Sequence, residues 1–78
     1  MIRFRFKELL AKSEFSENRR ITINEVADAT GIHRVTLGKL ANDRGYNAGT
    51  ELIDRLCRYF NCQPGDLMEY VPDESLKK

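Results

Sequence analysis

The sequence predicts an all-α domain, a compact bundle of five helices, and three observations favour this fold class. Apolar residues recur at the three- and four-residue spacing of helices in several stretches. Glycine, asparagine and proline separate these stretches at short intervals. The composition, with 41% hydrophobic and 32% charged residues, is typical of a globular chain. A length of 78 residues allows one modest core, so we expect residues 1–78 to form a single domain.

Residues 22–40 are the segment around which the rest of the chain is organised. Thr22 can cap a helix and Glu25 can reciprocate, so this capping box predicts a helix that begins at Ile23. Gly31 predicts its end, because glycine adopts the left-handed conformation that closes helices. The next amphipathic run begins within two residues, so the two helices must cross steeply, as in a helix-turn-helix. The side chains predicted to face inward are Ile23, Val26, Ala27, Thr30, Ile32, Leu37 and Leu40.

Six residues of this segment resemble a known family. The lambda-repressor-like (Cro/Xre-type) helix-turn-helix domains carry an apolar residue, a small residue, a glycine and three more apolar residues at the offsets that are occupied here by Val26, Ala27, Gly31, Ile32, Leu37 and Leu40. The small residue matters physically, because a longer side chain would push the crossing helices apart. The resemblance covers about residues 6–70 and implies a five-helix fold and binding to double-stranded DNA.

The remaining helices follow from periodicity and from turn residues. A first helix is expected over residues 6–13 and a polar loop over 14–20. A second loop at 42–49 precedes a helix that Thr50 can cap, with an apolar stripe formed by Leu52, Ile53, Leu56, Cys57 and Phe60. Asn61 can close that helix, and Pro64 suits the first position of a short fifth helix over 64–70. Residues 73–78 are expected to form a frayed tail.

The N-terminal residues follow a different pattern. Apolar and basic side chains alternate over residues 1–6, which is the period of a strand. The other strand-like stretch is 68–71, so we expect the two termini to pair in a small sheet, within one subunit or across a dimer. The alternative is that Phe4 and Phe6 begin the first helix.

If the resemblance holds, residues 34–40 form the recognition helix of the motif, with its N-terminal residues against base edges in the major groove. Arg34 is the best candidate to read a base, because its guanidinium matches the two acceptors of guanine. Val35 can touch a thymine methyl group, and Lys39 can reach a base or a phosphate. The candidates for phosphate contact are Thr22, His33, Arg44, Thr50, Arg19 and Arg20.

Several of these assignments have alternatives. Arg19 and Arg20 can equally be solvated loop residues, and Thr22 and Thr50 are expected to cap their helices in any case. An imidazole caps a helix imperfectly, so for His33 we prefer phosphate donation over simple exposure.

Two residues depart from the family pattern. Ile23 stands where the family usually has a polar residue that contacts the DNA backbone. Gly38 lies inside the recognition helix, where it leaves room for the DNA or a partner, or else weakens DNA binding.

Charge and composition limit the other possibilities. The net charge is +1, but residues 1–44 carry nine basic and six acidic side chains, whereas residues 45–78 carry four and six. The uneven distribution is compatible with one nucleic-acid face. With one histidine and two cysteines, Cys57 and Cys62, a four-ligand metal site is not expected, and we predict buried, reduced thiols. No signal peptide, membrane span, cofactor or small-molecule ligand is indicated, so a cytoplasmic location is expected.

Three function classes remain to be compared. An enzyme is not expected, because the sequence lacks a phosphate-binding loop, a nucleophile elbow and a second histidine. A sequence-specific DNA-binding regulator, acting as a homodimer, is the preferred hypothesis. The alternative is an adaptor or antitoxin-like module that uses the same fold to bind protein, which the near-neutral net charge favours.

Overall fold

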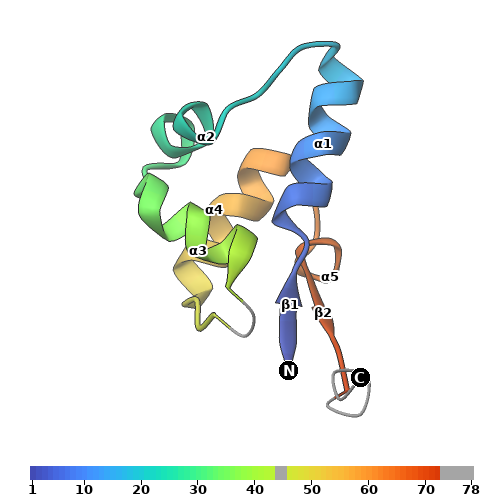
Figure 1. The fold of residues 1–78 in the computed structure, drawn as a ribbon, viewed down its shortest axis with the longest axis vertical. Helices are drawn as coiled ribbons and strands as arrows, with labels where there is room; N and C mark the ends of the chain where they lie inside the picture. Colours follow the sequence, from blue (N-terminus) through green and yellow to red (C-terminus); the bar gives the residue numbers. More distant parts are fainter. Residues whose placement is uncertain (44–45, 73–78) are drawn as a thin grey trace.

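Five helices and a two-stranded sheet make up the described residues, 1–43 and 46–72, of the computed structural model (Figure 1). This architecture confirms the predicted helical bundle and the small terminal sheet. In chain order the elements are β1 (Ile2–Phe4), α1 (Phe6–Glu17), α2 (Ile23–Thr30), α3 (Arg34–Asn42), α4 (Thr50–Phe60), α5 (Pro64–Leu67) and β2 (Met68–Tyr70).

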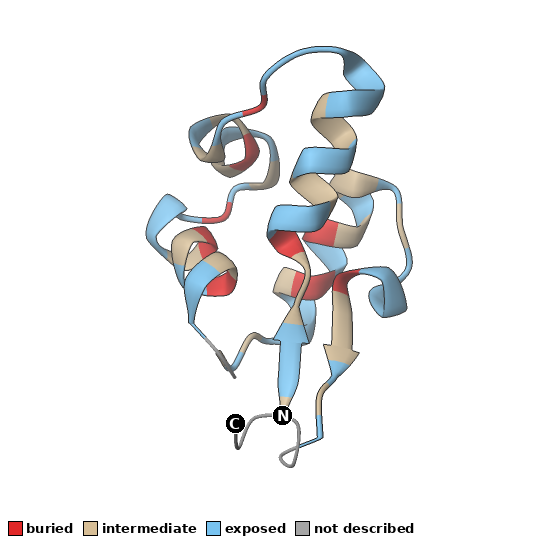
Figure 2. Ribbon diagram, turned by 45° about the vertical axis from the view of Figure 1, so that its right-hand side comes forward, coloured by how far each residue is buried: buried red, intermediate tan, exposed pale blue. Residues whose placement is uncertain are grey.

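The core lies where the five helices meet (Figure 2). Four side chains in it have no exposed surface, and they come from four different helices: Val26, Leu37, Leu56 and Leu67. Five others complete the buried set: Phe6, Ile21, Ile32, Leu40 and Ile53. The predicted inward residues Ile23, Ala27 and Thr30 are partly buried. The core therefore joins both motif helices to α4 and α5.

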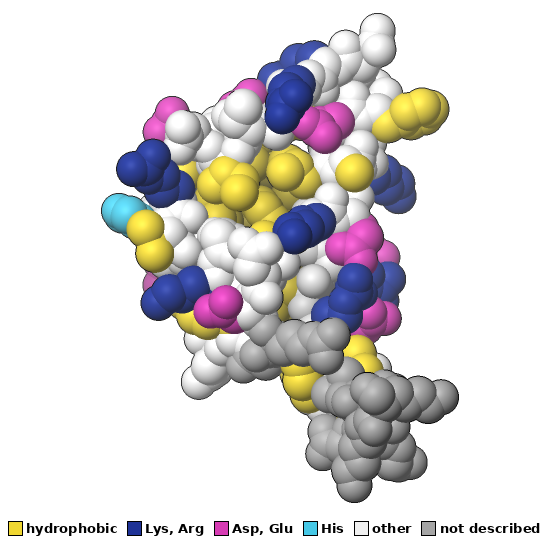
Figure 3. Space-filling view, in the orientation of Figure 1, with side chains coloured by type: hydrophobic (Ala, Val, Ile, Leu, Met, Phe, Trp, Pro, Cys, Tyr) yellow, Lys and Arg dark blue, Asp and Glu magenta, His cyan; other side chains and the backbone are white. Residues whose placement is uncertain are grey.

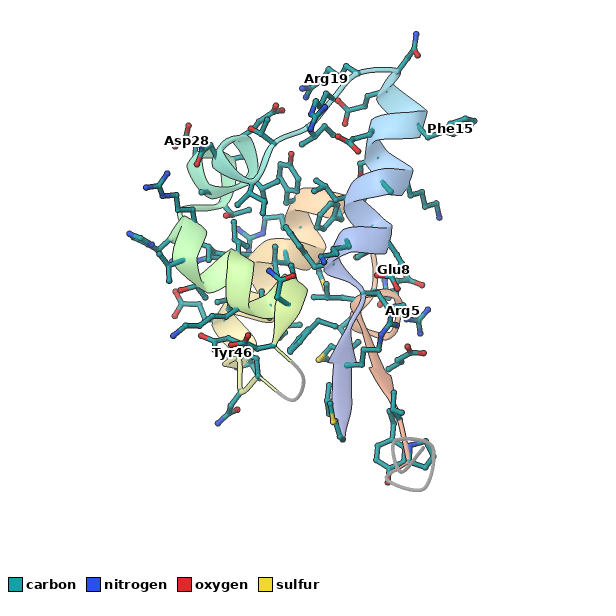
Figure 4. All side chains as sticks on the ribbon, in the orientation of Figure 1. Arg5, Glu8, Phe15, Arg19, Asp28 and Tyr46 are labelled. Carbon is teal, nitrogen blue, oxygen red and sulfur yellow. The ribbon has the colours of Figure 1, made fainter. Side chains whose placement is uncertain are left out.

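α1 is about one turn longer than the sequence predicts. The helix continues through residues 14–17, where a loop was expected, and ends where Asn18 adopts the left-handed conformation with φ 54°. The added turn is mostly solvent-exposed, and Phe15 points away from the bundle (Figure 4). Apolar periodicity therefore could not indicate it. Glu14 in this turn accepts a hydrogen bond of 2.8 Å from the buried Ile21 backbone N–H, which ties the following connection to α1.

α4 carries the predicted apolar stripe but begins differently. Thr50 is its first helical residue, and Gly49 is the capping residue. The Gly49 carbonyl accepts the first helical hydrogen bonds from Leu52 and Ile53, at 3.1 and 3.2 Å. The prediction that Thr50 caps α4 was therefore wrong by one residue, since its hydroxyl makes no capping bond. At the other end, Asn61 closes the helix with φ 53°, as predicted.

α5 is shorter than predicted, because its last expected residues form a strand. Pro64 does occupy the first turn, but the helix ends at Leu67 and Met68–Tyr70 pairs with Ile2–Phe4. The pairing is antiparallel and lies within one chain, in the register Ile2↔Tyr70, Arg3↔Glu69 and Phe4↔Met68. This arrangement confirms that the two terminal segments pair.

The two faces of the sheet differ in chemistry. Phe4 and Met68 pack against the core on one face. On the other face Arg3 forms ion pairs with Glu8 and Glu69. The hydrogen bond from Arg3 is the main cause of the lowered pKa of Glu8. The sheet thus attaches the start of the chain to α1 and to the C-terminal end of the bundle.

The two cysteines are less buried than the sequence predicts. Cys57 and Cys62 are free and partly buried rather than buried, and desolvation raises the pKa of Cys62 to about 11. Over residues 1–43 and 46–72, no group of three or more His, Cys, Asp or Glu side chains is placed to hold a metal ion. Within the same ranges, no helix combines the length and apolar character that a membrane crossing needs.

Candidate nucleic-acid interface

The connection between α2 and α3 is fixed by hydrogen bonds of its own residues. Gly31 adopts φ 75°, which confirms the predicted left-handed turn, and its N–H donates to the Ala27 carbonyl at 2.9 Å. The Thr30 hydroxyl donates to the Val26 carbonyl at 2.7 Å and accepts from the Ile32 N–H at 3.2 Å. These bonds satisfy backbone groups that the end of a helix leaves unpaired. The direction in which α3 leaves α2 is therefore well defined.

Arg55 of α4 holds the same turn from the other side. Its Nη1 atom lies 3.4 Å from the Thr30 carbonyl oxygen and 3.5 Å from that of Gly31. Its Nη2 atom donates to Glu51 at 2.8 Å, one turn earlier on α4. A cation at the C-terminal end of α2 also opposes the negative end of the helix dipole. Sequence reasoning did not identify this contact, because the partners are 24 and 25 residues apart.

The first turn of α3 is capped by His33. The Val35 backbone N–H donates to His33 Nδ1 at 3.1 Å, so the ring does perform the capping role for which the sequence analysis considered it poorly suited. An accepting Nδ1 carries no proton, and the neutral ring therefore holds its proton on Nε2. His33 is exposed, so Nε2–H remains available as a donor at the start of α3.

The outer surface of α3 carries the residues that were predicted to read bases. Arg34, Val35 and Lys39 are all exposed, and Val35 has 55% of its surface accessible, which is high for a large apolar residue. Leu37 and Leu40 lie on the opposite side in the core. The structure therefore leaves all three predicted base-contact residues on the solvent side of α3.

The helix also extends two residues beyond the predicted end at 40. This added segment includes Asn42, an exposed polar residue one turn beyond Gly38. Its side-chain amide donates to the Gly38 carbonyl at 3.0 Å. The sequence analysis assigned Asn42 to a loop, and only the helical register shows that it shares the outer face of α3.

Ion pairing separates the arginines into two groups. Most described arginines lie within 4 Å of a carboxylate: Arg3, Arg5, Arg19, Arg55 and Arg58. In the described part of the chain, Arg20 and Arg34 have no such partner. Dark blue and magenta side chains lie next to each other at several places near the edge of the face shown in Figure 3, consistent with this mutual neutralisation. The guanidinium of Arg34 therefore projects an uncompensated charge from the start of α3.

The predicted phosphate-contact residues are distributed over three places. Thr22 caps α2, since its hydroxyl accepts from the Glu25 N–H at 3.1 Å, so the predicted start at Ile23 is confirmed. Arg20 is exposed just before it. Thr50 begins α4 without a capping bond. Arg44 lies outside the described residues.

Arg19 is engaged with its own protein rather than directed outward. Its guanidinium donates to both carboxylate oxygens of Glu25, at 2.9 and 2.6 Å, and to Glu17 at 3.0 Å (Figure 4). These bonds lower the pKa of Glu25, chiefly through the hydrogen bond from Arg19, and raise that of Arg19. A capping box would also have the Glu25 carboxylate accept a hydrogen bond from the Thr22 backbone N–H. That carboxylate is bound to Arg19 instead.

Comparison with known proteins decides the family. The model of the Cro/C1-type helix-turn-helix DNA-binding domain matches residues 5–73. The chain belongs to this family. The match includes every helix and β2, and it confirms the resemblance that the residues of the motif indicated.

A curated relative of this Cro/C1-type chain supports a regulatory role. It is YozG of Bacillus subtilis (strain 168), described as an uncharacterized HTH-type transcriptional regulator. The two sequences are 30% identical over 56 residues, which is 72% of this chain and 67% of the relative. Family and relative together support a DNA-binding regulator and give no indication of an enzyme.

Proposed function

We propose that this protein is a transcriptional regulator that recognises a specific double-stranded DNA sequence by placing α3 in the major groove. The observation that carries the proposal is the unpaired, exposed guanidinium of Arg34 at the first position of α3. Five other arginines are neutralised by carboxylates, so among the described arginines Arg20 and Arg34 keep an unpaired charge, and Arg34 is the one that lies on α3. In helix-turn-helix proteins the N-terminal residues of the second helix contact base edges.

Each of the three predicted base-contact residues of α3 then has a distinct role. Arg34 donates two hydrogen bonds to the O6 and N7 atoms of a guanine. Val35 packs against a thymine methyl group, which explains an apolar side chain that is 55% exposed. Lys39, one turn further, reaches a base edge or a phosphate. Sequence is read by these contacts, whereas phosphate contacts set the position of the domain.

Phosphate contacts come from both motif helices. The Nε2–H of His33 is free to donate because Nδ1 is committed to the cap. Thr22 lies at the N-terminus of α2, whose free amides favour an anion, and Arg20 is adjacent and unpaired. Thr50, at the start of α4, and Arg44 complete the proposed set. Arg19 joins it only by leaving Glu25, so we expect its contribution to be small.

A homodimer on a two-fold site is the second part of the proposal. One helix of nine residues covers only a few base pairs. Two copies would place their recognition helices in successive major grooves, about 34 Å apart, and supply the remaining affinity and specificity. Sedimentation with and without the selected duplex tests this part. A monomer at micromolar concentration in both conditions would count against it.

Selection of bound duplexes from a random pool, followed by fluorescence anisotropy, tests the DNA-binding function. We expect one enriched sequence and a loss of about 10- to 100-fold in affinity for Arg34→Ala, since a bidentate contact to guanine contributes roughly 1–3 kcal/mol. The matched control is Arg58→Ala, which removes an equal charge from an arginine paired with Asp54 on α4 and should leave affinity unchanged.

Two outcomes would contradict this function. The first is a folded wild-type protein that enriches no sequence, which would favour the alternative of a protein-binding module. The second is equal affinity of wild type and Arg34→Ala for an enriched duplex, which would remove α3 from the recognition surface.

A further inference from the structure

Gly38 lies midway along α3 and is partly exposed. Positions three and four residues apart lie on the same side of a helix, so Arg34 and Val35 flank Gly38 on one side and Asn42 on the other. All three flanking side chains are exposed. The centre of the proposed recognition surface is therefore the one position that carries no side chain.

The fold itself does not require this glycine. A Cβ atom built at Gly38 meets nothing within 4 Å, and the residue has no left-handed backbone. Gly31 provides the contrast, because it has φ 75° and an added Cβ would lie 3.2 Å from Nη1 of Arg55. The turn therefore explains Gly31, whereas nothing within the described chain explains Gly38. Alanine would fit there and would favour the helix.

We propose that Gly38 is the point of closest approach between α3 and the duplex, where base edges on the floor of the major groove contact the bare helix backbone. This inference rests on the proposed function, because it names how the same surface meets DNA. A side chain at this position would hold the helix away from the base pairs. Without one, Arg34 and Val35 reach bases beside the point of contact.

The position of Asn42 is consistent with this close approach. Its amide donates to the Gly38 carbonyl at 3.0 Å, so the side chain lies back along the helix rather than extending outward. It stays more than 4 Å from the Cβ position at Gly38. No neighbouring side chain therefore covers the space above Gly38, as close contact with a base-pair edge requires.

Gly38→Ala tests the proposal through two measurements that are expected to move in opposite directions. The melting temperature should rise by about 5 °C, because alanine favours a helix over glycine. Affinity for the duplex selected by the wild type should fall by roughly tenfold or more, as for the loss of a base contact. A larger side chain in Gly38→Leu should weaken binding further while the protein still folds.

Gly65→Ala is the matched control. Gly65 is also a helical glycine, and a Cβ built there meets nothing within 4 Å. It lies in α5, across the molecule from α3 (Figure 1). We expect its affinity for the selected duplex to equal that of the wild type.

The outcomes distinguish this inference from the function on which it rests. If the wild type selects a duplex and Gly38→Ala binds it equally well, the close approach is wrong and the DNA-binding function stands. If Gly38→Ala lowers the melting temperature, the glycine serves the fold and the inference is also wrong. If the wild type selects no duplex, the proposed function itself fails.

Discussion

The two helices of the motif are both well anchored in the core, but they are reinforced very differently at their ends and surfaces. α2 has a threonine cap at its start, a left-handed glycine at its end and the guanidinium of Arg55 against its last carbonyls. α3 has an imidazole cap, a glycine in its interior and an extended residue, Asp43, at its end. The interior glycine alone costs about 1 kcal/mol relative to alanine.

The comparison shows that α3, not α2, carries residues that stabilise a helix poorly. The imidazole cap and the interior glycine of α3 lie away from its core-facing side, where Leu37 and Leu40 are buried. These two departures therefore fall on the surface that we propose contacts DNA. Local rules of stability are commonly broken at functional sites and obeyed elsewhere.

The largest expected effect separates the two sides of α3. Leu37→Ala should lower the free energy of unfolding by about 2–5 kcal/mol, because it leaves a cavity at a fully buried position. Val35→Ala should change it by no more than about 0.5 kcal/mol, since that side chain is 55% exposed. Urea denaturation followed by circular dichroism measures both. Similar losses for the two variants would mean that the outer face also stabilises the fold.

Removing the caps compares the two helices directly. Thr22→Ala should lower the free energy of unfolding by about 1 kcal/mol, because the Glu25 backbone N–H loses its capping acceptor. His33→Ala should cost less, about 0.5 kcal/mol or below, because an imidazole is not among the effective capping groups. Thr50→Ala is the control, since its hydroxyl makes no capping bond. A larger loss for His33→Ala than for Thr22→Ala would reverse the comparison.

The smallest expected effect concerns the ion pair at the start of α2. Because Arg19 lowers the pKa of Glu25 below its ordinary value of 4.5, the pair stabilises the fold at neutral pH. That stabilisation disappears as the pH falls through the lowered pKa. The difference in melting temperature between wild type and Arg19→Ala should thus be present at pH 7 and vanish once the pH is below the lowered pKa of Glu25. Arg20→Ala, which breaks no described ion pair, should show no such change, and a constant difference for Arg19→Ala would contradict the assignment.

The motif and the core could be predicted because they depend on local spacing. A turn is predicted by Gly31, and the buried faces of the two helices are predicted by Val26 and Leu37. The structure has the turn and both buried side chains at these positions. The end of α1 could not be predicted in this way. Residues 14–17 are polar and mostly exposed, so the helix continues with no apolar repeat, and its end depends on the left-handed conformation of Asn18.

The remaining differences arise from contacts between distant residues. Arg55 contacts the turn only because α4 packs against α2. The Glu25 carboxylate binds the Arg19 guanidinium instead of the backbone at the start of its own helix. Residues 68–70 can continue a helix on local grounds, but pairing with β1 prevails. The predicted site residues on α3 depend on helical register alone, and the structure leaves each of them exposed, with Asn42 as the addition.

The terminal sheet has a mechanical consequence. Met1 and Val71 exchange backbone hydrogen bonds at 2.9 and 2.8 Å, and the antiparallel register places these two residues at the same end of the sheet. A force that pulls them apart would therefore load the hydrogen bonds one after another, as in a zipper, rather than all at once. We expect β1 and β2 to separate at low force while the helices remain folded. Tension on the chain ends would thus spare the motif.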